Sequence, residues 1–244
     1  MRRIFLNCPA STSPTARRLA APLESRGGGF FLTHLTAIEE TTSMKRIIRA
    51  VVMALLLAPG MLWADDLMQQ WKAGADAYEA GDYETAYEIL LPIAERGDMF
   101  AQFNLGFMYH QGQGVLQDYA EAARWYRLAA EQGNASSQYN LGIMYRQGQG
   151  VPQDYSEAVR WYRAAAEQGH ADAQFNLAFM YAHGNGVIQD YSTAHVWFNI
   201  AARNGDSDAV NNRDAIADRM TPEAIAKSQS RARICIESDY QDCD

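Results

Sequence analysis

Cysteine, histidine and long apolar runs are scarce in this 244-residue chain, and each scarcity excludes a class of protein. The sequence holds 3 cysteines and 5 histidines, and they are not clustered as a zinc site would require. The run of apolar residues at 50–58 falls far short of the roughly 20 that span a bilayer. No nucleophile elbow, zinc-protease helix or phosphate-binding loop occurs. The sequence therefore predicts a protein that is not an enzyme and holds no metal or cofactor.

The apolar run is part of a targeting segment. Residues 44–64 begin with a basic stretch, continue through the run and a Pro-Gly break, and end at Ala64, which is the pattern of a cleaved secretory signal peptide. Because such signals act from the N-terminus, we expect translation to start at Met44 and residues 1–43 to be a mis-annotated upstream extension. A disordered extension is the alternative. Retention of the signal as an anchor is a second alternative, since Leu62 suits cleavage poorly.

Basic residues are few once this leader is removed. Residues 1–64 carry 8 of the 21 Lys and Arg and 3 of the 29 Asp and Glu, which leaves 13 basic and 26 acidic residues and a formal charge of −13. A surface of that charge repels nucleic acid and anionic lipid. We therefore expect a protein or peptide partner, no nucleic acid, and no integral membrane insertion after cleavage. The signal predicts a periplasmic or secreted protein of a Gram-negative envelope.

Two cysteines remain in the exported part. Cys8 lies in the leader, so Cys235 and Cys243 are an even pair in an oxidising compartment. Such a pair predicts one disulfide that pins the C-terminal tail. Free thiols are the alternative.

A 36-residue period organises the middle of the chain. Residues 98–133, 134–169 and 170–205 align without a gap. Each copy contains Gln-aromatic-Asn-Leu, Met-Tyr, a glycine pair followed by Val, Gln-Asp-Tyr, and a Trp followed by two alanines. Gapless copies of so long a pattern indicate stacked structural repeats.

Each repeat is expected to form two helices. In the first copy, Ala101 and Leu105 share one face of the first helix at four-residue spacing. Gly112 ends that helix, because glycine tolerates positive φ. Asp118 is the expected N-cap of the second helix, and Glu121, three residues later, would complete a capping box. The glycine pair is interpreted as a turn rather than a phosphate loop, since a turn explains every copy.

The repeated motifs resemble those of the Sel-one-like repeat family, a relative of the tetratricopeptide repeat with a longer loop between its helices. The resemblance rests on Asn-Leu-Gly at residues 104–106 and 140–142, on Gly-x-Gly-Val-x-x-Asp in all three copies, and on Trp-(Tyr/Phe)-x-x-Ala-Ala. The third copy has Ala178 in place of the Gly. The resemblance implies an all-α fold, a right-handed α-solenoid, for which we expect about five antiparallel helix pairs.

The flanking segments are expected to cap the ends of the solenoid. Residues 65–97 resemble an ordinary tetratricopeptide pair without the long glycine loop. Residues 206–244 read as a C-terminal helical cap, in which Thr221 and Pro222 open the last helix. Atypical ends are needed because they cover the apolar faces of the terminal repeats.

Candidate ligand contacts lie on the first helix of each repeat, at positions outside the buried stripe. An aromatic residue and an apolar residue four positions later share a face beside an Asn. In tetratricopeptide domains the similar Asn can hydrogen-bond a bound peptide backbone. The predicted concave groove comprises Phe103, Asn104, Phe107, His110, Gln111, Tyr139, Asn140, Ile143, Arg146, Gln147, Phe175, Asn176, Phe179 and His183. The alternative is that the aromatics pack between adjacent first helices and the Asn residues cap neighbouring helices.

The sequence thus predicts an exported scaffold, an adaptor or regulator that binds a protein or peptide. Two alternatives remain open. Some secreted members of the resembled family are reported to interact with peptidoglycan or β-lactam ligands, which implies a protein that binds or hydrolyses cell-wall ligands. Those members typically carry a cysteine pair in every repeat, which this chain lacks. The other alternative is a regulatory subunit of a surface-polysaccharide or secretion system.

Overall fold

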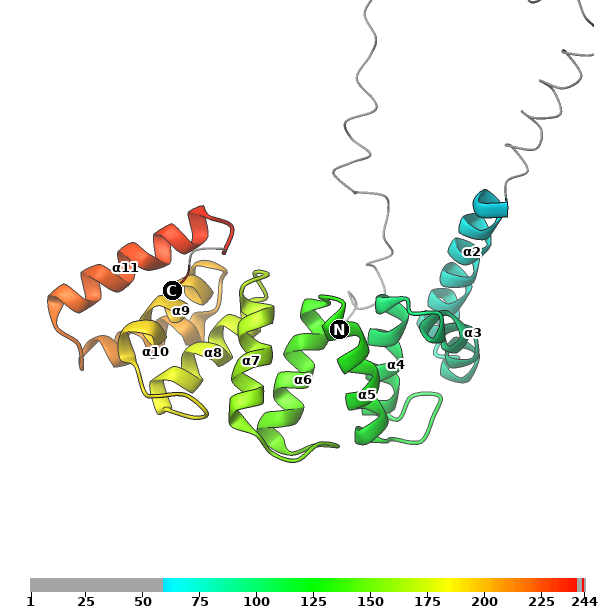
Figure 1. The fold of residues 1–244 in the computed structure, drawn as a ribbon, viewed down its shortest axis with the longest axis horizontal. Coiled ribbons are helices and arrows are strands. Elements are labelled where there is room, and N and C mark those ends of the chain that lie inside the picture. Colours follow the sequence, from blue (N-terminus) through cyan, green and yellow to red (C-terminus); the bar gives the residue numbers. More distant parts are fainter. Residues whose placement is uncertain (1–58, 241–242, 244) are drawn as a thin grey trace, which may run out of the picture. The chain divides into compact units, whose positions relative to one another are not determined.

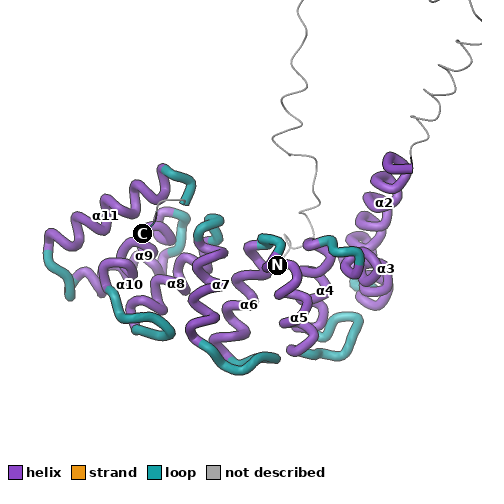
Figure 2. Tube along the Cα trace, viewed as in Figure 1, coloured by secondary structure: helices purple, strands orange, loops and turns teal. Residues whose placement is uncertain are grey.

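The structure is a computed structural model that describes residues 59–240 and residue 243. Every regular element in that part of the chain is an α-helix, as the sequence predicts (Figure 2). The chain divides into two compact units between Ala75 and Asp76. The predicted extension 1–43, and the predicted signal up to residue 58, lie outside the described residues.

Helix α2 (Pro59–Glu79) contains the described part of the first unit and runs into the second. Pro59 and Gly60, interpreted from the sequence as a helix break, are the first described residues of this helix. The predicted cleavage point after Ala64 lies within it. Export and cleavage stay predictions.

The second unit is a row of helices, each packed against its neighbours in the sequence as far as α9 (Figure 1). They are α3 (Tyr83–Glu95), α4 (Met99–Gln111), α5 (Tyr119–Glu131), α6 (Ala135–Gln147), α7 (Tyr155–Ala166), α8 (Ala171–His183), α9 (Tyr191–Arg203), α10 (Ser207–Ala217) and α11 (Pro222–Glu237). With α2, the described residues hold ten helices, among which α4 and α5, α6 and α7, and α8 and α9 form the packed pairs of the three repeats. The expected α-solenoid is confirmed, although α10 and α11 both pack on α9.

The second helix of each repeat begins at an Asp, as expected. Asp118 Oδ1 accepts hydrogen bonds from the backbone N–H of Ala120 at 2.8 Å and of Glu121 at 3.1 Å. The second half of the predicted capping box is wrong. The Asp118 N–H donates instead to the Tyr109 carbonyl at 3.0 Å, and Glu121 pairs with Arg124 at 2.8 Å. The long loop closes onto the preceding helix and uses the N–H that a capping box needs.

Removing one of these caps should destabilise the fold measurably. Asp154 Oδ1 accepts from Ser156 N at 2.8 Å and from Glu157 N at 3.0 Å. We expect Asp154→Ala to lower the free energy of unfolding by about 1 kcal/mol, because two N–H groups at the start of α7 lose their acceptor. Urea unfolding followed by circular dichroism measures the change. Glu131→Ala, which removes an exposed carboxylate at the end of α5, is the control; an equal loss in both variants would contradict the capping role.

The glycine pairs are turns, as interpreted, and they also set the stacking of repeats. Gly148 (φ +71°) caps α6, and Gly150 has φ +69°. A Cβ atom on Gly150 would overlap the carbonyl of Tyr119 and come within 2.6 Å of Ala120 N, at the start of the second helix of the preceding repeat. The same approach recurs for Gly114 at Tyr83 and for Gly186 at Tyr155. The second glycine therefore lets each loop rest on the repeat before it.

Each repeat contains one buried Gln side chain that makes two hydrogen bonds. One bond reaches a backbone carbonyl of the preceding repeat, and the other joins an amide side chain further along the sequence. Gln138 Nε2 donates to the carbonyl of Ala130 at 3.1 Å, and Gln138 Oε1 accepts from Gln168 Nε2 at 2.7 Å. Equivalent bonds join Gln102 to Ala94 and Gln132, and Gln174 to Ala166 and Asn204. We call Gln102, Gln138 and Gln174 the glutamine relay. The relay gives a hydrogen-bond donor to a backbone carbonyl near the end of the preceding helix, which the packing of successive repeats removes from water.

The repeated tryptophan and tyrosine residues differ in burial. The three Trp residues are buried, at positions 125, 161 and 197. Tyr145 and Tyr181 are half-buried, and so is Tyr109. Their hydroxyl groups are the reason, because they reach polar partners on the preceding repeat: Tyr109 bonds Tyr87, Tyr145 bonds Arg127, and Tyr181 bonds Arg163.

The C-terminal cap is fastened to α9 by polar as well as apolar contacts. Ser228 on α11 and His195 on α9 are both buried, and Ser228 Oγ lies 2.7 Å from His195 Nδ1. Cys235 and Cys243 are paired, with Cα atoms 4.4 Å apart. This pairing is the one that the sequence predicts; oxidation in the cell stays a prediction.

Candidate binding surface on the first helices

The predicted groove residues lie on α4, α6 and α8, at positions that repeat every 36 residues. We call these fourteen residues the first-helix face. Their burial is uneven. Phe103 is 8% exposed and Asn104 only 2%, whereas Tyr139 and Asn140 on α6 are half-buried. The prediction of three equivalent contact positions is therefore corrected: on α4 the aromatic ring and the amide are both inside the protein.

The aromatic rings of the first-helix face pack against neighbouring rings. The Tyr139 ring lies 6.1 Å from that of Tyr162 on α7 and stacks at 4.7 Å on His170, which precedes α8. The Phe175 ring meets Phe198 on α9 at 5.5 Å. Phe175 thus packs on the second helix of its own repeat, whereas Tyr139 contacts both the second helix of its repeat and the N-cap of the next first helix, α8. Because Tyr139 and Phe175 are half-buried, part of each ring still faces solvent.

The second row of apolar residues is also half-buried. It consists of Phe107, Ile143 and Phe179. Phe179 stacks on His183 at 4.0 Å, and His183 Nδ1 lies 2.9 Å from the Phe179 carbonyl oxygen. This row leaves apolar surface in contact with water at equivalent places on α4, α6 and α8.

The three asparagines differ in what they can offer a ligand. Asn176 Nδ2 donates to the carbonyl of Asp172 in its own helix at 2.8 Å, so it does not cap a neighbouring helix. Asn104 Oδ1 is buried and accepts no hydrogen bond from the described residues. Asn140 is half-buried on α6. An Asn amide can donate and accept at once, which suits an extended peptide backbone, and Asn140 is the most suitable of the three.

Polar side chains border the face at the end of each first helix. Gln111, Gln147 and His183 are exposed, and His110 and Arg146 are half-buried. Burial lowers the pKa of His110, whose ring lies 5.2 Å from that of Tyr119. The neutral imidazole is therefore favoured near pH 7, and this border carries little positive charge on α4.

Several buried polar side-chain atoms on α6 and α7 have no partner that meets hydrogen-bond geometry in the described part of the chain. They include Arg146 Nε and the hydroxyl oxygen of Tyr162. Burial raises the pKa of Tyr162, and the charge of Arg146 opposes that rise. The phenol is therefore protonated at neutral pH, and it lies beside Arg146 of the first-helix face.

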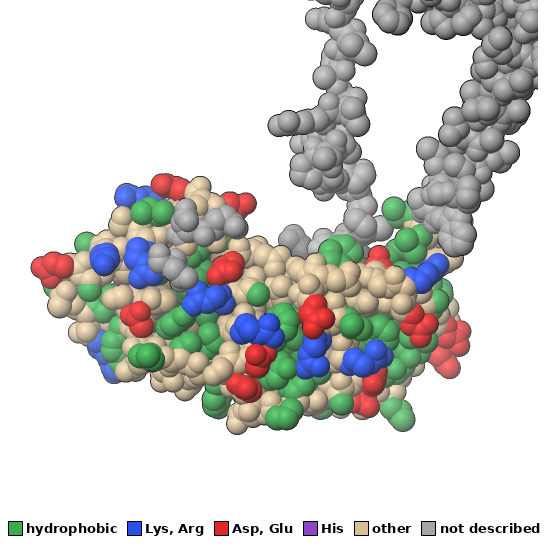
Figure 3. Space-filling model, viewed as in Figure 1, with side chains coloured by type: hydrophobic (Ala, Val, Ile, Leu, Met, Phe, Trp, Pro, Cys, Tyr) green, Lys and Arg blue, Asp and Glu red, His purple; other side chains and the backbone are tan. Residues whose placement is uncertain are grey.

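The described residues offer no site for a metal ion: no three His, Cys, Asp or Glu side chains within them are grouped to hold one. Nor does any helix in residues 59–240 combine the length and apolarity needed to cross a membrane. On the face that Figure 3 presents, acidic and basic side chains are interspersed along the row of helices. Ion pairs at the surface include Glu121–Arg124 and Glu157–Arg160.

Sequence reasoning recognised the repeated Gln but did not assign it a role. The glutamine relay recurs at the same position in each copy and is buried, and both features mark a structural group rather than a ligand contact. A polar residue repeated without change on an otherwise apolar helix is the signal that could have identified it. Other residues line a pocket in the C-terminal cap, between α9, α10 and α11. No repeated pattern marks them in the sequence, because the cap is not one of the three repeats.

Solved structures of similar proteins share this architecture. A Sel1 repeat protein from Oxalobacter formigenes is 38% identical, with a TM-score of 0.55, over 57% of this chain and 58% of that chain. A protective antigen of uropathogenic Escherichia coli strains that displays an SLR fold is 32% identical, with a TM-score of 0.61, over 72% of this chain and 39% of that chain. The chain therefore spans less than two thirds of either relative. A comparison with curated proteins finds no match.

The family comparison agrees with the helix pairs. The Sel1 repeat pattern matches residues 100–134, 135–170 and 171–206, which cover the pairs from α4 to α9. Sel1 repeats generally act as scaffolds for protein–protein interaction. The family pattern, the paired helices and the similar solved structures agree, and over residues 100–206 the chain belongs to the Sel1 repeat family.

Proposed function

We propose that the protein is an exported, non-catalytic scaffold of the cell envelope that binds an extended segment of a partner protein on its first-helix face. The observation that carries this proposal is the incomplete burial of Tyr139, Ile143, Phe175 and Phe179. By contrast, Leu105, Leu141 and Leu177 on the same first helices, and the three repeated Trp side chains, are buried. A partner that covers this remaining apolar surface would gain roughly 25 cal/mol for every Å² removed from water.

The polar groups beside these side chains suit a peptide backbone. Asn140 lies next to Tyr139 on α6, and Gln147 is exposed at the end of the same helix. The repeat spacing places equivalent groups on α8, where Asn176 Nδ2 is already bonded but Oδ1 is not. An extended segment that runs from α6 to α8 would therefore meet amide groups alternating with apolar surface. The targeting segment at residues 44–64 supports the envelope as the place of action.

Affinity capture from envelope extract tests the proposal. The bait is the protein itself, compared with a variant that carries Asn140→Ala, Ile143→Ala and Phe179→Ala. We expect the variant to retain less than about a tenth of the captured partner, since each truncated contact contributes roughly 1 kcal/mol to binding. Leu128→Ala, at a residue 37% exposed on the second helix α5, is the matched control and should capture as the parent does.

Both variants must first show the helicity and urea midpoint of the parent, because the three positions are only half-buried. Equal capture by parent and triple variant would place the binding site elsewhere on the molecule. Failure of the parent to retain any partner would count against a scaffold role in the envelope.

A further inference from the structure

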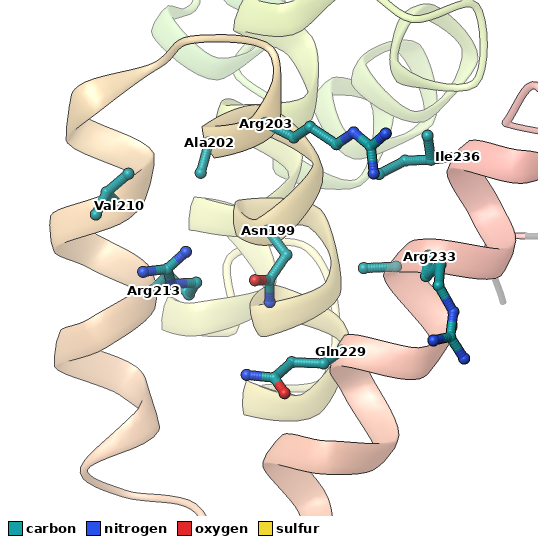
Figure 4. Close-up of a pocket in the computed structure, with 9 residues that line it drawn as sticks. Asn199, Ala202, Arg203, Val210, Arg213, Gln229, Arg233 and Ile236 are labelled. Atoms are coloured by element: carbon teal, nitrogen blue, oxygen red, sulfur yellow. The ribbon is translucent and has the colours of Figure 1, made fainter.

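A pocket of 370 Å³ lies in the C-terminal cap, away from the first-helix face (Figure 4). It exists because α10 and α11 both pack on α9, which leaves a space bounded by all three helices. The three Sel1 repeats have no equivalent of this arrangement, since there each helix packs in series with the next. The pocket is therefore a feature of the cap alone.

One part of the pocket is apolar. Val210 lines it from α10, Ala202 from α9 and Ile236 from α11. These side chains are half-buried, so their surfaces toward the pocket are open to a ligand. Alanine on α9 keeps this part wide, and Val and Ile give it branched walls. It fits a small aliphatic group.

Positive charge lies beside the apolar part. Arg213 points from α10 into the space near Asn199, and Arg203 extends from the end of α9 toward Ile236 (Figure 4). Arg213 forms an ion pair with Asp214 at 2.7 Å and has a side chain 28% exposed. Arg203 forms no ion pair with a carboxylate of the described residues. A third arginine, Arg233, lines the rim from α11.

This charge stands out against the composition of the chain. Residues 65–244 hold 26 acidic and only 13 basic residues. Three of these basic residues, all arginines, nevertheless line one pocket. Guanidinium groups bind carboxylates through paired, charge-assisted hydrogen bonds. The concentration of charge indicates an anionic ligand.

Two amide side chains complete the lining. Asn199 Nδ2 donates to the carbonyl of His195 at 2.7 Å, which commits the nitrogen to α9 and leaves Oδ1 to accept from a ligand. Gln229 reaches from α11 toward Arg213 (Figure 4). An acceptor beside a cationic group suits a ligand that carries both an anionic group and an N–H donor.

We propose that this pocket binds the free C-terminus of a peptide that ends in a small aliphatic residue. The α-carboxylate pairs with Arg213, the last backbone N–H donates to the neighbouring Asn199 Oδ1, and the aliphatic side chain enters the space lined by Ala202 and Val210. Each of the three parts of the ligand meets a complementary part of the lining. This site is separate from the proposed partner surface on α6 and α8.

Calorimetric titration of the full chain with acetyl-Gly-Ala-Val tests the proposal. We expect a dissociation constant on the order of 0.1 mM, which is typical of a ligand of this size with modest efficiency. The C-terminal amide of the same peptide should bind at least tenfold more weakly, because it lacks the charge that Arg213 recognises. Inorganic phosphate should show no comparable binding at the same concentrations.

Variants locate the site. Arg213→Gln should weaken binding at least tenfold, whereas Arg160→Gln, which removes an exposed arginine from α7, should leave it unchanged. Ala202→Leu fills the apolar part without altering charge and should also weaken binding several-fold. Circular dichroism confirms that each variant keeps its helices.

Several results would overturn the proposal. They are no binding of the free acid up to about 10 mM, a range that reaches well into weak affinities, equal binding of acid and amide, equal binding of phosphate, or an equal effect of Arg160→Gln. The triple variant of the first-helix face should bind the peptide normally. Its behaviour separates failure of this site from failure of the scaffold proposal.

Discussion

Replacing Gly150 by alanine should lower the free energy of unfolding by about 3 kcal/mol or more. Two effects add at this position. An L-residue with positive φ loses about 1–2 kcal/mol relative to glycine, and Gly150 has φ +69°. The added Cβ would also overlap the carbonyl of Tyr119, a backbone group at the start of α5 that no rotamer change can move aside. The loop of one repeat must then lift off the repeat before it.

Gly133→Ala separates the two effects. Gly133 also has positive φ, at +95°, but a Cβ placed there meets no atom within 4 Å. This control should therefore lose only the backbone contribution, about 1–2 kcal/mol. Urea unfolding followed by circular dichroism gives both values. Equal losses in the two variants would show that the approach to Tyr119 contributes nothing to stability.

The Gly150 variant should also unfold less cooperatively. In a stacked array each repeat contacts only its neighbours, so a weakened interface between two repeats uncouples the parts on either side. We expect a lower m-value for Gly150→Ala and an unchanged m-value for Gly133→Ala, because m reflects how much surface is exposed in one transition. A broadened transition in the first variant alone would locate the defect at the interface.

The sequence predicted the helices well because their signals are local and occur three times. Asp118 caps α5 and Gly112 ends α4, as their residue types and positions suggest. Each expected repeat also starts at an N-cap, at Asp98, Asn134 and His170. A period of 36 residues shows which features are structural, since a feature repeated in every copy serves the repeat itself.

Contacts between repeats were harder to predict. The capping-box motif suggested that Glu121 would bond back to the N-cap, but the long loop brings the carbonyl of Tyr109 to that N–H first. The second glycine of each loop was understood as part of a turn, while its partner lies about 30 residues earlier in the chain, as Gly150 and Tyr119 show. A sequence pattern identifies a residue's own conformation more readily than its distant neighbour.

The candidate surface shows the same limit. Helical spacing correctly placed Phe103, Tyr139 and Phe175 at one position of three equivalent helices. It could not predict that Phe103 would be buried while the other two stay half-buried, because that difference depends on position within the array. The arginine pocket of the cap was not foreseen either, since residues from α9, α10 and α11 come together only through tertiary packing.

Gln138→Leu should lower the free energy of unfolding by about 2 kcal/mol, although leucine fits a buried position and favours helix. Gln138 is 6% exposed, donates to the Ala130 carbonyl and accepts from Gln168. Leucine of similar size can do neither. A net hydrogen bond contributes about 1 kcal/mol, and a buried group left without its partner costs about 1–3 kcal/mol. The gain from the added apolar surface is smaller, because water is already excluded there.

The control is Gln147→Leu, at the exposed end of the same helix, which should change stability by less than about 0.5 kcal/mol, as surface substitutions usually do. A double-mutant cycle with Gln168→Ala then isolates the hydrogen bond from Gln168 Nε2 to Gln138 Oε1. If Gln138 and Gln168 stabilise the fold through each other, their combined loss should fall short of the sum by roughly 1 kcal/mol. Additive losses would mean that the 2.7 Å contact contributes little. A coupling of the expected size would show that the buried amide, and not apolar packing alone, ties the first helix of its repeat to the chain that follows the second helix.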